Sequence, residues 1–335
     1  MRNKTLKKTL ATALLFAFAI GSLAGCGNKN ISSAQAAELN QDRAIRIADQ
    51  ANYFTAKVAL EKGFLKEEFG DDFTFELSIF ENGPAINEAL TAGKIDLASY
   101  GDNPAIQGYS GGVDVKIVST LWLSDNAYAL IAGPNSGIES LDDLRGKKIG
   151  YAAATTTHQL ILKILDRQGI SESDVTLVNI KRVEGNAAVA SGELDANIAE
   201  QPFEAALEQT GGKIITTNKD YNVQPVFVLA SGEFARNNPD TLSRILKAYD
   251  KANRWIYENE EEAAKIVSDI NGNDIEGVKT YYKTRQWTIG WDENLTKGLN
   301  ESIKFSYDNG NIPAIFDAGE LVDTSFLEKA GLYKK

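Results

Sequence analysis

The segment Glu88–Ile106, EALTAGKIDLASYGDNPAI, contains in order a helix end, a glycine turn, a short apolar strand, a polar loop and a proline that opens the next helix. The segment Ala187–Ala205, AAVASGELDANIAEQPFEA, repeats this order further along the chain. Two copies are fewer than a solenoid needs, because stacked repeats bury a common core only when three or more adjoin. The pair favours two similar α/β lobes; the alternative is a chance similarity within one α/β fold.

Short β-branched runs alternate with helical patterns from Ala44 onward, which is typical of an α/β protein with mainly parallel sheets. After Gly232 the strand patterns stop, and we expect a mainly helical segment. Its clearest helix begins at Asn238-Pro239, and an apolar face with one polar member, Asn253, continues to Ile256. The expected strands are Ile45–Ala48, Phe73–Phe80, Asp96–Ser99, Val115–Leu123, Tyr128–Ala132, Lys148–Ala152, Val175–Ile180, Ala196–Ala199, Lys213–Ile215 and Val226–Ala230.

The first residues have the pattern of an export signal. A basic start is followed by the apolar run Leu10–Leu23, which is shorter than the about 20 residues that a membrane span needs. The run ends in Leu-Ala-Gly-Cys, which resembles the lipobox of bacterial lipoproteins, and Cys26 is the sole cysteine of the chain. We therefore expect a signal peptide at 1–25, a diacyl lipid on Cys26 and a flexible tether at 26–43. The alternative is an ordinary signal peptide with a chance cysteine.

The charge and the rare residues narrow the class of protein. The chain carries a formal charge of −11, and removal of a basic leader makes the remainder more acidic. We therefore expect neither nucleic acid nor an anionic lipid surface as a partner, because an acidic surface repels both. A single cysteine excludes a disulfide within the chain, and one histidine with one cysteine cannot build a typical transition-metal site. We expect a monomer without a cofactor.

Five segments between Ala44 and Leu332 follow one another in a specific order and spacing: ALEKGFLKEEFG (59–70), ENGPAINEALTAGKIDLASYGDNPAI (81–106), SGIESLDDLRGKKIGYAAATTTH (136–158), AAVASGELDA (187–196) and GNIPAIFDAGELVDTSFLEKAGL (310–332). In these segments the chain resembles the substrate-binding lipoproteins of ABC importers for aliphatic sulfonates, taurine and nitrate. That group also includes binders of thiamine-pyrimidine precursors.

The resemblance implies a two-lobe α/β fold, the type II periplasmic-binding-protein fold, and an ABC permease with its ATPase as partners. It places lobe 1 at 44–132, lobe 2 at 133–226 and the return to lobe 1 at 227–335, with crossovers near 129–134 and 226–231. Small molecules bind beyond the carboxyl ends of strands in such sheets, so we expect a ligand cleft between the lobes. Hinge closure would then bury the ligand.

Three threonines, Thr155, Thr156 and Thr157, open an apolar helical pattern and are the first candidates for this cleft. A helix start presents unpaired N–H groups and about half a positive charge, so it binds an anion without lysine or arginine. Capping is the alternative, because Thr156 with Gln159 fits a capping box. The family usually has a glycine where this chain has Ala154. The neighbouring His158, the only histidine, is expected to stay neutral and to pack or donate a hydrogen bond.

Other cleft candidates follow the remaining strand ends. Asp102 could hold a ligand ammonium or cap the next helix, and Arg182 could reach the cleft or stay on the surface. Glu200 and Gln201 stand where many sulfonate binders have a tryptophan, which favours a polar or amino-bearing ligand. Trp287 and Trp291 are expected to be packing residues. The further candidates for ligand contact are Asn52, Tyr53, Phe54, Gly101, Asn103 and Trp122.

The one match to a catalytic motif lies between the wrong secondary-structure elements. Gly108–Gly112 matches G-x-S-x-G, but a nucleophile elbow joins a strand to a following helix, and this motif leaves a helix and enters a strand. Related pyrimidine-forming enzymes have a cysteine-rich segment and several histidines, which this chain lacks. We therefore expect an extracytoplasmic, lipid-anchored receptor that captures a small anionic solute. The alternatives are a binder of pyrimidine precursors or other amino-bearing solutes, and a sensor that reports to a signalling receptor.

Overall fold

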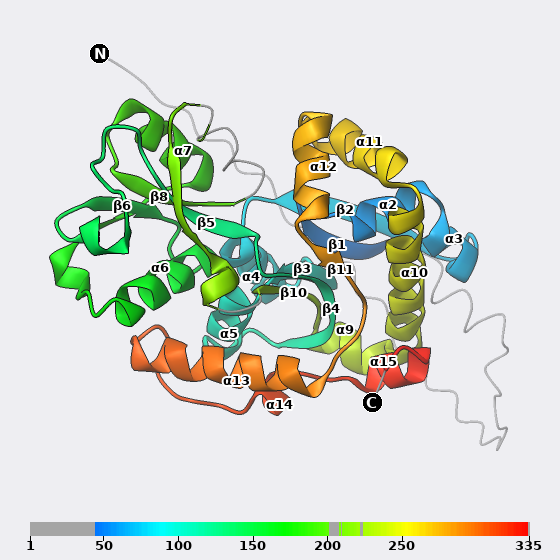
Figure 1. Ribbon diagram of the computed structural model, residues 1–335. Coiled ribbons are helices and arrows are strands. Elements are labelled where there is room, and N and C mark those ends of the chain that lie inside the picture. Colours follow the sequence, from blue (N-terminus) through cyan, green and yellow to red (C-terminus); the bar gives the residue numbers. More distant parts are fainter. Residues whose placement is uncertain (1–43, 201–207, 209, 222–223, 334–335) are drawn as a thin grey trace, which may run out of the picture. The chain divides into compact units, whose positions relative to one another are not determined.

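Two β-sheets organise the chain in a computed structural model that describes residues 44–200, 208, 210–221 and 224–333 (Figure 1). The expected leader 1–25, the tether with Cys26, and Gln201 lie outside these described residues. The first sheet has the strand order β11-β4-β10-β3-β1-β2. Its strands are β1 (Ala44–Gln50), β2 (Thr74–Phe80), β3 (Leu97–Gly101), β4 (Val115–Ser124), β10 (Gln224–Ser231) and β11 (Gln286–Trp287).

The second sheet has the strand order β7-β6-β8-β5-β9. Its strands are β5 (Tyr128–Ala132), β6 (Lys148–Tyr151), β7 (Thr176–Asn179), β8 (Ala196–Glu200) and β9 (Lys213–Thr217). All ten strands expected from the sequence are present in the two sheets. The two-residue strand β11 is an addition, within a region that was expected to be free of strands.

Both sheets are mixed rather than mainly parallel. Strand β1 is parallel to β2 and β3, and β6 is parallel to β7 and β8. In contrast, β10 is antiparallel to β3 and β4, and β5 is antiparallel to β8 and β9. The reason is the path of the chain: β5 and β10 each enter their sheet from the other one, and so run against the strands they join.

Two connections link the sheets, and one asparagine ties them together. The chain leaves the first sheet after Ser124 and returns to it at Gln224. The side-chain oxygen of Asn218 accepts from the backbone N–H groups of Ala127 (2.8 Å) and Tyr128 (3.0 Å), and its amide donates to the carbonyl of Ser124 (3.0 Å). The sequence placed the first crossover near 129–134, but the chain has already crossed before β5, which belongs to the second sheet. An apolar strand such as Tyr128–Ala132 suits either sheet, and only its pairing with β8 and β9 shows to which sheet it belongs.

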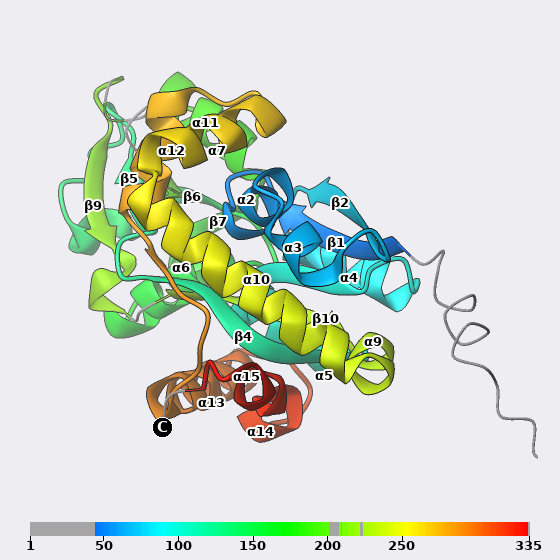
Figure 2. The same cartoon turned by 90° about the vertical axis from the view of Figure 1, so that its right-hand side faces the viewer.

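Helices cover the two sheets, and α10 runs beside α2, α3 and α15 (Figure 2). Around the second sheet lie α6 and α7, and the C-terminal part is helical as expected. No helix in the described part of the chain is long and apolar enough to cross a membrane. The helices are α2 (Thr55–Glu61), α3 (Phe64–Phe69), α4 (Gly83–Thr91), α5 (Asp102–Ser110), α6 (Thr156–Arg167), α7 (Arg182–Ser191), α9 (Gly232–Asn237), α10 (Pro239–Glu258), α11 (Glu260–Asn271), α12 (Ile275–Lys283), α13 (Glu293–Asp308), α14 (Ala318–Leu321) and α15 (Ser325–Ala330).

The predicted apolar face of α10 is buried as a whole, including its one polar member. The side-chain oxygen of Asn253 accepts a hydrogen bond from the hydroxyl of Thr55 at 2.7 Å, whereas its buried amide nitrogen has no partner among the described residues. The predicted packing roles of Trp287 and Trp291 are confirmed, since both side chains are buried in the core. The G-x-S-x-G match lies at the end of α5, before β4, which is the reverse of a nucleophile elbow.

Candidate functional site

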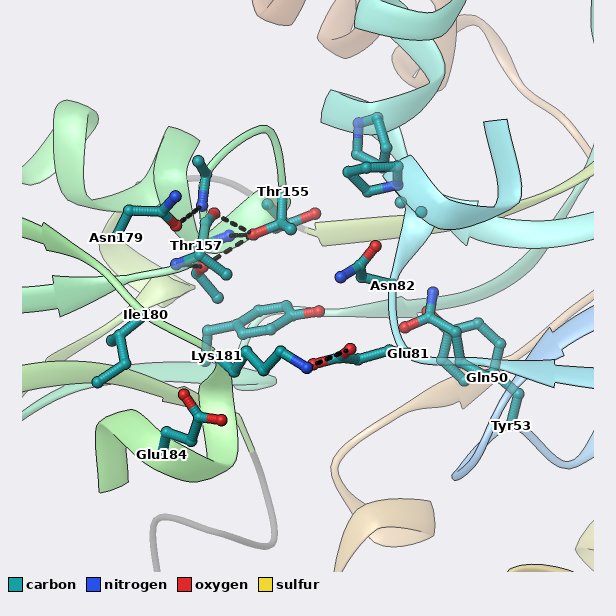
Figure 3. A pocket seen from close by; sticks show the side chains of 18 residues that line it. Gln50, Tyr53, Glu81, Asn82, Thr155, Thr157, Asn179, Ile180, Lys181 and Glu184 are labelled. Atoms are coloured by element: carbon teal, nitrogen blue, oxygen red, sulfur yellow. Dashed lines mark hydrogen bonds and ion pairs between the residues drawn. The ribbon is translucent and has the colours of Figure 1, made fainter. Parts of the chain in front are cut away.

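Four helices begin around one cavity of about 390 Å³ (Figure 3). The starts of α4 and α5 come from the first sheet, and those of α6 and α7 come from the second. Gln50, Tyr53 and Tyr128 complete its walls. The helices begin here because each follows the carboxyl end of a strand, where α/β sheets bind small molecules. Each helix N-terminus contributes a partial positive charge to the cavity.

The three threonines at the start of α6 have different roles. Thr155 is the N-cap of α6: its hydroxyl donates to the carbonyl of Ala152 at 2.7 Å and accepts from the N–H of Thr157 at 3.2 Å. The hydroxyl of Thr157 accepts from the N–H of Ala152 at 3.1 Å. The cap is therefore Thr155 and not Thr156, which the capping-box pattern favoured. Two of the three hydroxyls hold the turn itself in shape.

Thr156 is left to face the cavity. Neither its hydroxyl nor its N–H has a hydrogen-bond partner among the residues that the structure describes. Its side chain is buried against Gly101 of the first sheet, where a Cβ atom would lie only 2.6 Å from the threonine hydroxyl oxygen. A helix N-terminus with a free hydroxyl and a free N–H is suited to bind an oxyanion.

The turn before α6 is strained. Ala154 has φ +59°, and it is the sole residue other than glycine with a positive φ in the described ranges. This is the position where the resembling family usually has glycine, and a side chain there costs about 1–2 kcal/mol. Asn179 of the adjacent strand end holds the turn, because its side-chain oxygen accepts from the N–H of Ala153 at 2.9 Å. Surrounding contacts thus keep the backbone in a conformation that alanine disfavours.

One ion pair crosses the cavity. Lys181, before α7, lies 3.2 Å from Glu81, which follows β2, and Figure 3 shows the two side chains meeting from opposite sides. Both side chains are more than half exposed, so the pair contributes little to stability. Glu184 adds a second carboxylate to the lining. Lys181 is the sole cation among the described lining side chains, and the pairing with Glu81 reduces its availability to an anion.

Five of the residues proposed from the sequence line this cavity: Tyr53, Gly101, Thr155, Thr156 and Thr157. Asn103 lies beside it and links the lobes, since its amide donates to the carbonyl of Thr155 at 2.8 Å. Asp102 is buried and accepts from Gln224 at 2.9 Å and from Ser302 at 3.1 Å, outside the lining.

The remaining candidates lie elsewhere in the structure. Asn52 accepts from the side chains of two asparagines in and after α11, and Phe54 and Trp122 are fully buried in an aromatic cluster. Glu200 is buried in an ion pair with Arg285. Arg182 is the first residue of α7 rather than the end of a strand, and its side chain is outside the description.

Sequence reasoning missed seven lining residues that have polar side chains. They are Gln50, Glu81, Asn82, Tyr128, Asn179, Lys181 and Glu184. A signal for four of them was present: Glu81 and Asn82 follow one strand, Asn179 and Lys181 end or follow another, and both strands lead into a helix. Applying the strand-end rule to these two junctions would have found them.

His158 packs against Tyr151 with ring centroids 4.7 Å apart. Burial lowers the pKa of His158, and the nearby Glu172 opposes this shift in part. The expectation of a neutral packing histidine agrees with this environment.

Acidification is expected to destabilise the protein through this histidine. Because the pKa of His158 is lowered on folding, its contribution to stability is present above the unfolded value of about 6.5 and is lost as the pH falls through the folded value. The His158→Gln variant should therefore lose less unfolding free energy than the wild type between pH about 7.5 and about 5. The chain has one histidine, so a single imidazole NMR signal reports the titration directly. A midpoint at or above about 6.5 would contradict the prediction.

Comparisons with known proteins agree with this architecture. A protein of Bacillus subtilis (strain 168), provisionally named an aliphatic sulfonates-binding protein, is 29% identical over 313 residues, which are 92% of this chain and 93% of the relative. The taurine-binding periplasmic protein of Escherichia coli (strain K12) is 25% identical over 303 residues, covering 85% and 92% of the two chains.

Among solved structures, the periplasmic aliphatic sulphonate binding protein of Escherichia coli superposes with a TM-score of 0.75. The match covers 84% of this chain and 97% of that one at 24% identity, and it confirms the predicted periplasmic-binding-protein fold. The NMT1/THI5 like family matches residues 50–263, which is more than half of the chain. The chain therefore belongs to the NMT1/THI5 like family.

Proposed function

We propose that this protein is the solute-binding receptor of an ABC importer and that it captures a small sulfonate, with taurine as the reference compound. It binds the solute between two lobes, closes over it and presents it to a permease and its ATPase. No covalent chemistry on the solute is part of this proposal. The names of the relatives support the class of solute, and the cavity at the four helix starts supports the mode of binding.

The observation that carries the proposal is the start of α6. Thr156 offers an N–H and a hydroxyl that have no partner in the described part of the chain. Both are rigidly presented, because Thr155 and Thr157 hold the turn. A sulfonate spreads its charge over three oxygens and accepts hydrogen bonds from such groups, with the helix dipole adding a favourable interaction.

The carboxylates in the lining favour an amino group on the same solute. Glu81, which pairs with Lys181, and Glu184 stand beside the starts of α4 and α7, whereas the first turn of α6 carries no acidic residue. A zwitterion such as taurine can place its sulfonate at the start of α6 and its ammonium beside these carboxylates. A simple alkanesulfonate lacks the second interaction, so we expect it to bind more weakly.

Thermal unfolding of the full chain with taurine, ethanesulfonate and nitrate tests the proposal. A ligand at a hundred times its dissociation constant stabilises a protein by about 2.7 kcal/mol, which is a readable shift of the melting temperature. We expect the largest shift with taurine, and a reduced affinity in the Thr156→Val variant. Thr176→Val, on an exposed position of β7, is the matched control. Absence of a shift with every anion would refute the sulfonate assignment.

A second candidate solute has its own support. Tyr53 and Tyr128 present aromatic surface from the two sides of the cavity, and aromatic walls suit a planar ring such as a hydroxymethylpyrimidine. Stabilisation by that compound and by no sulfonate would favour it. Genes for a permease and an ATPase beside this one would favour import over a sensor role.

We also propose that Cys26 carries the lipid that holds the receptor on the outer face of the cell membrane. The support is its position as the chain's one cysteine at the end of the expected leader. Loss of membrane association in a Cys26→Ser variant tests it.

A further inference from the structure

We propose that the buried ion pair Arg285–Glu200 positions the two tyrosines that wall the cavity, Tyr53 and Tyr128, and thereby sets the affinity for the solute. This inference rests on the proposed role of the cavity as the ligand site. The pair itself lies outside the cavity lining.

The pair connects the two sheets. Glu200 is the last residue of β8 in the second sheet, and Arg285 stands between α12 and β11 of the first. The guanidinium Nη2 lies 3.1 Å from a carboxylate oxygen of Glu200, and the two side chains are 0% and 5% exposed. Both charges are therefore removed from water and depend on each other.

The position of Arg285 is set by several contacts. Its Nη1 donates to the carbonyl of Tyr281 at 2.9 Å and to the hydroxyl of Thr284 at 2.7 Å. Its guanidinium carbon lies 3.3 Å from the ring centroid of Tyr281 and 4.8 Å from that of Trp122. A cation held against two aromatic rings and two acceptors cannot shift without moving Trp122.

These contacts lead to a tyrosine on each side of the cavity. Trp122 packs edge-on against Tyr53, with centroids 5.9 Å apart and an angle of 86° between the rings. Glu200 stands opposite Tyr128 in the antiparallel ladder of β5 and β8. Since Tyr53 and Tyr128 both line the cavity, one ion pair links the wall contributed by the first sheet to the wall contributed by the second.

Removing one partner has a different consequence from removing both. A single neutral substitution removes the counter-charge at 3.1 Å from a charge that stays buried while the lobes are together, and water reaches that charge when the lobes separate. The single variants therefore favour separated lobes and displaced tyrosines, which lowers the apparent affinity. Replacing both partners by apolar side chains removes both charges and the penalty with them.

The test compares Arg285→Met, Glu200→Leu and the double variant in the full chain, with taurine as the probe. We expect each single variant to weaken taurine binding by about 10- to 100-fold, and the double variant to recover most of that loss. Arg236→Met breaks an exposed arginine–aspartate pair, in which the side chains are 63% and 60% exposed, and is the matched control. Equal affinity in the single variants and the wild type would overturn the proposal.

A ligand-free measurement separates this inference from the proposed function. In protein labelled with 3-fluorotyrosine, the ¹⁹F NMR signals of Tyr53 and Tyr128 are assigned by the Tyr53→Phe and Tyr128→Phe variants. Both signals should move in the single variants and stay in place in Arg236→Met. If the wild type does not bind taurine, the proposed function is wrong. The ¹⁹F signals of the ligand-free protein still show whether the ion pair positions the two tyrosines. Unmoved signals refute that role. Should Arg285→Met not fold, Glu200→Gln provides the comparison, because it removes the charge of one partner and keeps the size of its side chain.

Discussion

Replacing Lys57 by methionine is expected to lower the free energy of unfolding by about 3–5 kcal/mol, because it leaves the buried carboxylate of Asp49 without its counter-charge. The ammonium nitrogen of Lys57 lies 3.0 Å from a carboxylate oxygen of Asp49, and the side chains are 0% and 1% exposed. Burial lowers the pKa of Lys57 and raises the pKa of Asp49, and their mutual attraction opposes both shifts. A charge in such a place is tolerated only with its partner.

The same ammonium group also shapes the cavity wall. It donates to the carbonyl of Gln50 at 2.8 Å and to that of Tyr53 at 2.9 Å. Lys57 thus closes the loop between β1 and α2, and Gln50 and Tyr53, whose carbonyls it holds, both line the cavity. Folded Lys57→Met protein should therefore also bind its solute more weakly than the wild type.

Urea unfolding of the wild type and the variant measures the stability effect. Lys62→Met is the matched control, since Lys62 pairs with Glu262 at 2.8 Å on the surface, where side-chain exposures are 30% and 55%. A surface pair contributes about 0–1 kcal/mol, so the control should change little. A loss of less than about 1 kcal/mol in Lys57→Met would contradict the prediction.

Replacing Gly101 by alanine is expected to weaken solute binding by about 10- to 100-fold while the fold persists, since overpacking costs about 1–3 kcal/mol. Gly101 has φ −73°, which any residue adopts, so space and not backbone conformation requires glycine here. The added Cβ would lie 2.6 Å from the hydroxyl oxygen of Thr156, which belongs to the opposite lobe. The methyl group therefore opposes the approach of α6 to the first sheet.

Calorimetric titration of the solute found by thermal unfolding measures this effect. Gly290→Ala is the matched control, because nothing lies within 4 Å of the Cβ position of Gly290. The double variant Gly101→Ala, Thr156→Ala removes the atom that the new methyl group meets, so Gly101→Ala should weaken binding less in the Thr156→Ala background than in the wild type. If Gly101→Ala binds like the wild type, contact between these residues does not limit closure.

The local patterns of the chain determined its elements and the place of its site. Period-two and β-branched runs marked all ten longer strands, because a side chain's preference for a pleated, half-buried surface depends mainly on its neighbours in sequence. The threonines at 155–157 stood at the start of a helix that follows a strand, and the order of elements in α/β sheets puts such starts at one edge. The sequence alone therefore indicated that α6 begins in the cleft.

Which side chains face that cleft was decided by contacts between distant segments. Asp102 and Glu200 stand at strand ends, as ligand-binding residues would, yet Ser302 and Arg285, far away in the sequence, satisfy them inside the protein. Thr156 and not Thr155 is free because the cap depends on the backbone path through Ala154. A burial preference is a property of a residue, whereas a hydrogen-bond partner is a property of the packed structure. The sequence by itself thus determined where the candidate site lies, and only the tertiary structure decided which side chains line it.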